Sequence, residues 1–253
     1  MVEQDCVCNG VHEVAARRSR WSLHAALFAI IVLSCDMVTA QVSPQVCGSL
    51  DNGSNGPFDY LKVRDFRLKN VETFHFTPVV EALIRGQSTT EPAGDLIYVL
   101  KAFPNHHRAL DAMARLGKKL GTLNPPGMPP IECYFERALR FQPDDVVARM
   151  LYASFLLVNR RGADADKQLE AVVSAAGDNP FTHYNAGLIY FDNKNYDQAL
   201  IQAHRAYGMG FGQTKLREQL QSVGKWVEPS TLSTTPNSAS TSEKAPAVDK
   251  PKN

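Results

Sequence analysis

The spacing of small and aromatic residues within positions 180–211 constrains the fold more than any other feature of this sequence. Tyr190 follows Gly187 by three positions, and Ala206 follows Ala199 by seven. A glycine lets its helix approach a partner helix closely, and an aromatic ring one turn away fills the space beside the contact. The two alanines allow the same close approach from the partner helix. The spacing therefore predicts two short antiparallel helices that cross closely.

This pattern resembles the tetratricopeptide repeat, whose unit is a helix-turn-helix of about 34 residues. Helices in such a unit cannot bury their apolar faces alone, so the units stack on one another. The resemblance implies an all-α fold, a right-handed superhelix of antiparallel helix pairs. Phe135, Ala138 and Pro143 match the aromatic, small and proline residues that end a unit. The resemblance covers about residues 74–225, and a chance run of unrelated helical hairpins is the alternative.

The helix-ending prolines indicate that the units are not all of the same length. Pro104, Pro143 and Pro180 are 39 and 37 positions apart in the sequence. Because a unit of this family has about 34 residues, the middle units are expected to carry short inserts. We expect these inserts within residues 125–129 and 175–179.

The first 40 residues have the organisation of a signal peptide. Arg17, Arg18 and Arg20 form a basic region, and the largely apolar run 23–33 follows them. Residues 38–40 then supply the small side chains that a signal peptidase requires. The apolar run is shorter than the roughly 20 residues that span a bilayer as a helix. We therefore predict export and cleavage after residue 40, and we expect the mature protein in the periplasm.

Two alternatives for the N-terminus remain open in the sequence. Residues 32–35 fit a loose lipobox, in which Cys35 would be lipidated and would become the new N-terminus of a membrane-anchored lipoprotein. The segment would otherwise remain uncleaved and act as a signal anchor. In both alternatives the membrane is reached only through this N-terminal segment.

Two cysteines, Cys47 and Cys133, remain in the chain after residue 40. In an oxidising compartment they could form a disulfide that fastens the N-terminal arm to the helices. The alternative is two separate thiols, with Cys133 buried on a helix.

A short arm precedes the helical region. Residues 41–73 are expected to form this irregular arm, in which 58–71 alternates loosely and would be extended or a short strand. The helical period takes over in 74–228, the predicted repeat domain. Its first helix should begin after a Thr77 cap and should stop at Gly86.

The last residues, 229–253, change composition abruptly. Serine, threonine, proline, alanine and lysine dominate, and there is no aromatic side chain. Such a segment cannot bury enough apolar surface to offset the loss of chain entropy. We expect it to be disordered.

The resemblance implies that the first helix of each pair lines a concave groove. By repeat position, the groove would run from a basic end in the helix expected at 105–120 to an apolar and aromatic end in the helix that begins near 181. A partner segment with an acidic or C-terminal carboxylate end and a hydrophobic body would complement it. The alternative is that the basic cluster is an ordinary solvated helix face. The predicted groove residues are Arg108, Asp111, Arg115, Met150, Ser154, Phe181, Tyr184 and Leu188.

No catalytic, metal-binding or cofactor motif is recognisable in the sequence. The histidines are scattered, and no Gly-x-Ser-x-Gly elbow or dinucleotide-binding fingerprint occurs in its required context. A net charge of +1 gives no reason to expect nucleic-acid binding. An enzymatic alternative would use Asp59, Asp65 and His75, which lie loosely together in the sequence.

We therefore expect a non-enzymatic protein–protein interaction adaptor of the bacterial envelope, with no cofactor and no metal. Its partners would be proteins or peptide segments that dock in the groove. The alternatives are an envelope enzyme or enzyme subunit that uses the N-terminal arm, and a self-assembling structural lipoprotein.

Overall fold

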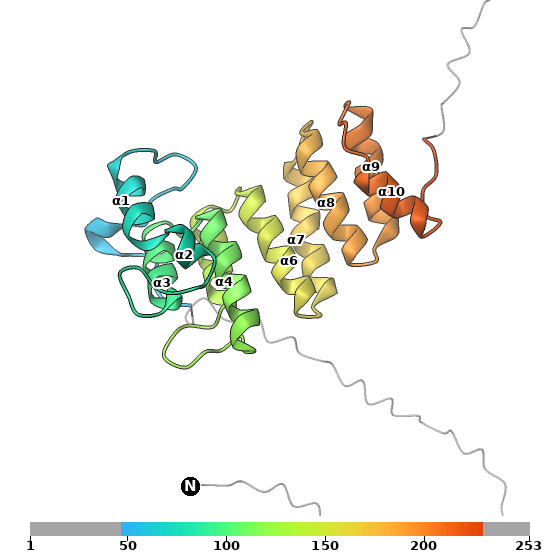
Figure 1. Ribbon diagram of the computed structural model, residues 1–253. Helices are drawn as coiled ribbons and strands as arrows, with labels where there is room; N and C mark the ends of the chain where they lie inside the picture. The colour runs from blue at the N-terminus through green and yellow to red at the C-terminus, as the bar shows by residue number, and fades with distance from the viewer. Residues whose placement is uncertain (1–46, 230–253) are drawn as a thin grey trace, which may run out of the picture. The chain divides into compact units, whose positions relative to one another are not determined.

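The computed structural model describes residues 47–229, and all regular structure within that range is helical (Figure 1). The all-α prediction is confirmed for this part of the chain. The predicted signal peptide, including Cys35, and all but the first residue of the predicted disordered tail lie outside the described residues. After a short 3₁₀ turn at Gly53–Asn55 come α1 (Phe66–His75), α2 (Pro78–Glu81), α3 (Pro92–Ala102), α4 (His107–Leu120), α5 (Glu132–Phe141), α6 (Val146–Val158), α7 (Gly162–Ala175), α8 (Pro180–Asp192), α9 (Tyr196–Gly208) and α10 (Lys215–Ser222).

Helices that are neighbours in the sequence pack against each other, most extensively α6 with α7 and α8 with α9. The helices α6 and α8 have equal lengths and begin 34 positions apart, at Val146 and Pro180. The helices α7 and α9 begin 34 positions apart as well, at Gly162 and Tyr196. In addition, α4 packs on α6 and α6 packs on α8, so alternate helices form a connected row.

The turn within each of these two helix pairs is also repeated. Arg160 and Lys194, again 34 positions apart, both have left-handed backbones, with φ of 62° and 61°. In both turns the amide of the following residue donates to a carbonyl five positions earlier in the chain, at 2.9 Å. This hydrogen bond is typical of a Schellman helix end. The left-handed residue of that motif is usually glycine, because glycine has no Cβ to clash with the backbone.

Replacing Lys194 by glycine is therefore expected to stabilise the protein. A side chain in the left-handed region costs about 1–2 kcal/mol, and part of that gain is lost to the greater chain entropy of glycine. We expect Lys194→Gly to raise the free energy of unfolding by about 0.5–1 kcal/mol in urea titrations. Lys194→Ala, which keeps the Cβ, is the matched control, and equal stability of the two variants would contradict the prediction.

The close helix crossing predicted within 180–211 is present. Tyr190, Ala199 and Ala206 are buried between α8 and α9. A methyl group built on Gly187 would lie 2.6 Å from the Leu216 side chain of α10, so only glycine fits there without a shift. The sequence therefore identified the contact of α8 with α9, and the packing of α10 on α8 adds a second reason for the glycine.

The unit-ending motif is placed in two different environments. Phe135 and Ala138 are buried on α5, as a helix–helix contact requires, whereas Pro143 is exposed just before α6. Pro180, in contrast, is the first residue of α8. Because these two prolines occupy different positions relative to their helices, their spacing is not the period of the units. The insert predicted at 175–179 is therefore wrong.

The other predicted insert is found where the sequence placed it. The caps of α4 and α6, His106 and Asp145, are 39 positions apart. The additional length lies in the connection 121–131 between α4 and α5. The cap of α4 is His106, whose Nδ1 accepts from the Ala109 amide at 3.2 Å.

The N-terminal arm is more regular than predicted. Residues 66–75 form α1, capped by Asp65, where an extended or irregular chain was expected. The helix α2 ends at Glu81 and not at Gly86, because Leu83 adopts a left-handed backbone with φ of 60°. The helix α1 buries only Leu68 and Val71, so its sequence carries little helical periodicity.

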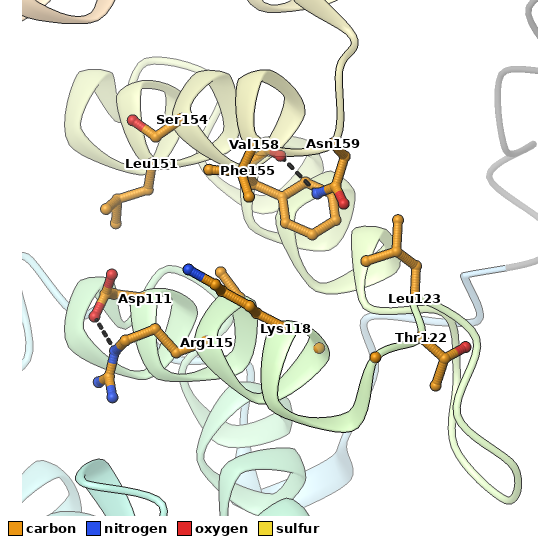
Figure 2. Close-up of a pocket in the computed structure, with 13 residues that line it drawn as sticks. Asp111, Arg115, Lys118, Thr122, Leu123, Leu151, Ser154, Phe155, Val158 and Asn159 are labelled. Carbon is orange, nitrogen blue, oxygen red and sulfur yellow. Dashed lines mark hydrogen bonds and ion pairs between the residues drawn. The ribbon is translucent and has the colours of Figure 1, made fainter. Parts of the chain in front are cut away.

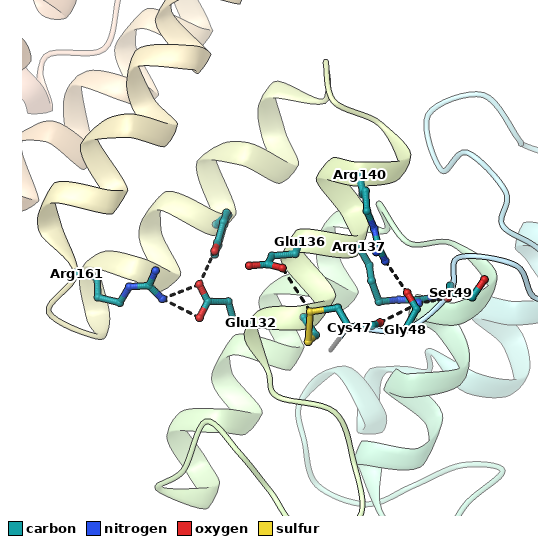
Figure 3. The surroundings of a disulfide bond; sticks show 10 residues. Cys47, Gly48, Ser49, Glu132, Glu136, Arg137, Arg140 and Arg161 are labelled. Carbon is teal, nitrogen blue, oxygen red and sulfur yellow. Dashed lines mark hydrogen bonds and ion pairs between the residues drawn. A yellow bond between two sulfur atoms is a disulfide. The ribbon is translucent and has the colours of Figure 1, made fainter. Parts of the chain in front are cut away.

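A disulfide joins Cys47 to Cys133 in α5, the pairing that the sequence left open (Figure 3). Two arginines of α5 strengthen this attachment by holding backbone carbonyls of the arm. Arg137 donates to the carbonyls of Cys47 and Ser49, and Arg140 donates to the carbonyl of Gly48 at 2.8 Å. The start of the arm is thus fixed to α5 by one covalent bond and several hydrogen bonds.

Within residues 47–229, no helix combines the length and the apolar character needed to cross a bilayer.

Candidate partner-binding groove

An open pocket lies between α4 and α6, with a volume of about 580 Å³ (Figure 2). One side is the exposed face of α4, and the other is the last two turns of α6. The first residues of the α4–α5 connection, Thr122 and Leu123, close one end. Pockets of about 300–1,000 Å³ lined mainly by apolar groups are typical of ligand-binding sites.

The α6 side of the pocket is apolar. Leu151, Phe155 and Val158 contribute most of this wall, and Leu123 continues it from the connection. Phe155 is buried, and its ring stacks on Phe135 at 4.8 Å between centroids, so this part of the wall is rigid. Val158 is 69% exposed. A valine this exposed within an apolar wall marks a surface that a partner can cover.

The α4 side of the pocket is charged, and most of its charges are already engaged. Arg115 donates to Asp111 at 2.8 Å and to the backbone carbonyl of Glu81 at 3.0 Å. Lys119, next to the pocket, donates to the carbonyl of Leu83 at 2.6 Å. Lys118 lines the pocket, and its side-chain ammonium makes no hydrogen bond or ion pair with any other residue of 47–229.

The structure brings three of the predicted groove residues together. Asp111 and Arg115 from α4 lie opposite Ser154 from α6. Arg108, one turn earlier on α4, does not line the pocket, because its guanidinium pairs with both carboxylate oxygens of Glu81.

Two other predicted groove residues, Met150 and Tyr184, do not line this pocket. Met150 is only 7% exposed and belongs to the core. Tyr184 is only 6% exposed, because the ring of Phe211, from the segment after α9, lies 4.6 Å from its own ring. Phe181 remains exposed at the start of α8, and Leu188 is half-buried against the core.

The predicted groove residues did not include the apolar wall of the pocket. Its signal is in α6, whose sequence VVARMLYASFLLV is apolar almost all the way round. A helix of this kind is either fully buried or has a face left for a partner. Val158 lies on that remaining face.

A buried polar network connects the arm, α4 and α6 at the helix starts. The Asn105 amide donates to Asp59 and to Asp145, at 3.0 Å each, and its oxygen accepts from the Tyr60 amide. His107 adds a bond of 2.8 Å to Asp145. Burial alone would raise the pKa of Asp145, but the bonds from His107, the Ala148 amide and Asn105 outweigh it and lower the pKa. The network fixes the starts of α4 and α6 relative to each other.

His106 is fully buried, and its bonds define its protonation. Because Nδ1 accepts from the Ala109 amide, the proton of the neutral ring is on Nε2, which donates to Glu72 at 3.2 Å. Burial lowers the pKa of His106 below 6.5, although the nearby Glu72 acts in the opposite direction. The folded protein therefore holds this ring neutral at pH values where the unfolded chain binds a proton.

Stability should fall as the pH drops below about 6.5, since the unfolded chain then takes up the proton that folded His106 resists. Asparagine caps helices and does not titrate. In urea titrations between pH 7.5 and pH 5, we expect a smaller loss of stability for His106→Asn than for the wild type. Equal pH dependence of the two proteins would remove His106 as the cause.

The residues of the enzymatic alternative are not joined in one site. Asp59 accepts from Asn105, Asp65 caps α1 and pairs with Arg67, and His75 bonds Asp95 at 2.8 Å. Among the residues described, no three histidine, cysteine, aspartate or glutamate side chains are arranged to hold a metal ion.

The comparisons with known proteins give no relative from which a role could be transferred. No family model matches the sequence, and no curated protein is detectably similar to it.

Proposed function

We propose that the chain is a non-enzymatic adaptor of the bacterial envelope, which binds a partner segment in the groove between α4 and α6. In this proposal the helices form tetratricopeptide-like antiparallel pairs in a right-handed superhelix. The 34-residue offset of α6–α7 from α8–α9, with its repeated turn, supports that arrangement. The connected row of α4, α6 and α8 corresponds to the first helices of such pairs.

One observation carries the binding proposal: an open groove of about 580 Å³ with a rigid apolar wall that is left partly exposed. Leu151, Phe155 and Val158 offer this wall next to charged groups of α4. Protein-binding sites combine an apolar centre with a polar rim in this way. The two sides of the groove are the helices α4 and α6, so a partner would meet a largely preformed surface.

The proposed location rests on two features of different kinds. The first 40 residues predict export, and a disulfide joins Cys47 to Cys133. Disulfides persist in oxidising compartments such as the bacterial periplasm. Lipidation at Cys35 would keep the same protein at the membrane surface, and incorporation of labelled palmitate separates that alternative from a free periplasmic adaptor.

Affinity capture from an envelope extract of the source cell tests the binding proposal. The bait is residues 41–253, compared with its Val158→Asp variant, which places a charge on the apolar wall. Ile201→Asp is the matched control, because Ile201 is also an exposed aliphatic residue of a helix and does not line the pocket. We expect partners captured by the wild type and by Ile201→Asp to fall at least about tenfold with Val158→Asp.

Circular dichroism and thermal melts must first establish that both variants remain folded. The same set of captured proteins with all three baits would refute binding in this groove. Capture of the chain itself, with a dimer in gel filtration that Val158→Asp dissociates, would assign the surface to self-association.

A further inference from the structure

We infer that the groove selects partner segments in which an internal aspartate or glutamate is adjacent to a large aliphatic or aromatic residue, and that Lys118 binds the carboxylate. The inference rests on the proposed function and adds the chemistry of the partner. It follows from the one cation of the α4 cluster whose side chain remains unpaired, Lys118, and from its position relative to the apolar wall.

One cation of the basic cluster on α4 is available to a partner. The basic cluster on α4 consists of Arg108, Arg115, Lys118 and Lys119. Three of the four are engaged inside the protein, with the Glu81 or Asp111 carboxylate or with the backbone carbonyls of Glu81 and Leu83. Within the described range 47–229, the side chain of Lys118 is the one in this cluster without a hydrogen-bond or ion-pair partner. A partner carboxylate can bind Lys118 without breaking an existing interaction.

The apolar wall of the groove lies beside Lys118. In Figure 2 Lys118 extends along the α4 side of the pocket, opposite Phe155 and Val158 of α6. A partner carboxylate at Lys118 would therefore have a neighbouring side chain on the apolar wall. Covering that wall excludes water from the ion pair and strengthens it. The acidic and the apolar residue of the partner thus reinforce each other.

The carboxylate that binds Lys118 could come from a chain terminus or from an aspartate or glutamate side chain. A C-terminal carboxylate is typically captured by several donors at once, as in a nest of backbone N–H groups. In the groove the guanidinium of Arg115 is already held by Asp111 and by the Glu81 carbonyl, which leaves the single ammonium of Lys118. Lys118 is a flexible point charge, which suits an aspartate or glutamate side chain within a segment.

The test is selection from a random 12-residue peptide library displayed at the N-terminus of a phage coat protein, with residues 41–253 as the bait. Because each displayed peptide continues into the coat protein, no peptide in the library has a free C-terminal carboxylate. We expect enrichment of sequences with an acidic residue within two positions of leucine, isoleucine, phenylalanine or tryptophan. The enriched peptides are then synthesised with amidated C-termini, and their affinities are measured by fluorescence polarisation.

Three variants of Lys118 separate charge from shape. Lys118→Glu reverses the charge and should weaken binding of the amidated peptides at least about tenfold. Lys118→Met keeps a long side chain without charge and should weaken binding less, whereas Lys118→Arg should retain it. Lys101→Glu is the control, because this exposed lysine of α3 does not line the groove. It should bind like the wild type.

The possible failures have different meanings. Enriched peptides without an acidic residue, or peptides whose affinity is unchanged in Lys118→Glu but lost in Val158→Asp, would overturn the role of Lys118 and leave the proposed groove in place. Peptides that bind equally to the wild type and to both groove variants would overturn the groove as well. Failure of the library to yield any binding peptide, while free-acid C-terminal peptides bind, would assign the carboxylate to a chain terminus and contradict the inference.

Discussion

Removing the disulfide is expected to have the largest effect on stability of any change to the covalent structure. The bond links residues 86 positions apart, and it joins the arm to α5. A loop of that length confines the unfolded chain strongly, and loss of a native disulfide typically costs about 2–5 kcal/mol. We expect the double variant Cys47→Ala, Cys133→Ala to lose free energy of unfolding in that range in urea titrations.

The structure adds a second expectation for this variant. Arg137 is largely buried, and it donates to two carbonyls of the segment that the disulfide holds. If that segment detaches, the guanidinium loses both acceptors, so the cost should lie toward the upper part of the range. The wild type unfolded in the presence of a thiol reductant is the control and should approach the double variant. Stability within about 0.5 kcal/mol of the oxidised wild type would show that the bond adds little.

The second large effect is expected for Asp145→Ala. The carboxylate of Asp145 caps α6 through the Ala148 amide and accepts from Asn105 and His107. Its removal leaves buried donors without acceptors and deletes a helix cap, each of which costs about 1–2 kcal/mol. We expect a total loss of about 3 kcal/mol in the free energy of unfolding.

Asp145→Asn is the matched control for this prediction. Asparagine is an equally good cap, so Asp145→Asn should retain the bond to Ala148 and lose the charge. Its stability should lie between those of the wild type and Asp145→Ala. If Asp145→Asn and Asp145→Ala are equally stable, the helix cap contributes nothing measurable. If Asp145→Ala is as stable as the wild type, the buried network does not hold α4 and α6 together.

The sequence was most informative where each contact is local. Within 180–211, the positions of Gly187, Tyr190, Ala199 and Ala206 predicted the crossing of α8 and α9, because both helices come from one short segment. Thr77, the predicted helix cap, does precede α2, but its side chain makes no capping hydrogen bond.

The arm was harder to predict for a physical reason. The helix α1 has only two buried residues, Leu68 and Val71, and it depends on α3 for its packing. A helix with so narrow an apolar face produces no clear period of 3.6 residues. Its formation depends on tertiary contacts, which the local sequence does not reveal.

The groove also combines features that the sequence predicted with features that depend on tertiary contacts. The positions of Asp111, Arg115 and Ser154 were implied by the repeat resemblance, and all three line the pocket. The burial of Tyr184 could not be foreseen, since it depends on how Phe211 folds back after α9. The engagement of the basic cluster depends on α2, which lies about 30 positions earlier in the chain and ends sooner than its sequence indicates.

The most direct test of the central claim is site-specific photocrosslinking in the source cell. A benzoyl-phenylalanine residue is placed at Val158 in the groove wall or, as the control, at Ile201 on α9. Binding in the groove predicts a crosslinked partner upon irradiation with the probe at position 158, and none at position 201. The same crosslinked product from both positions, or a product only from position 201, would contradict the proposal that partners bind between α4 and α6.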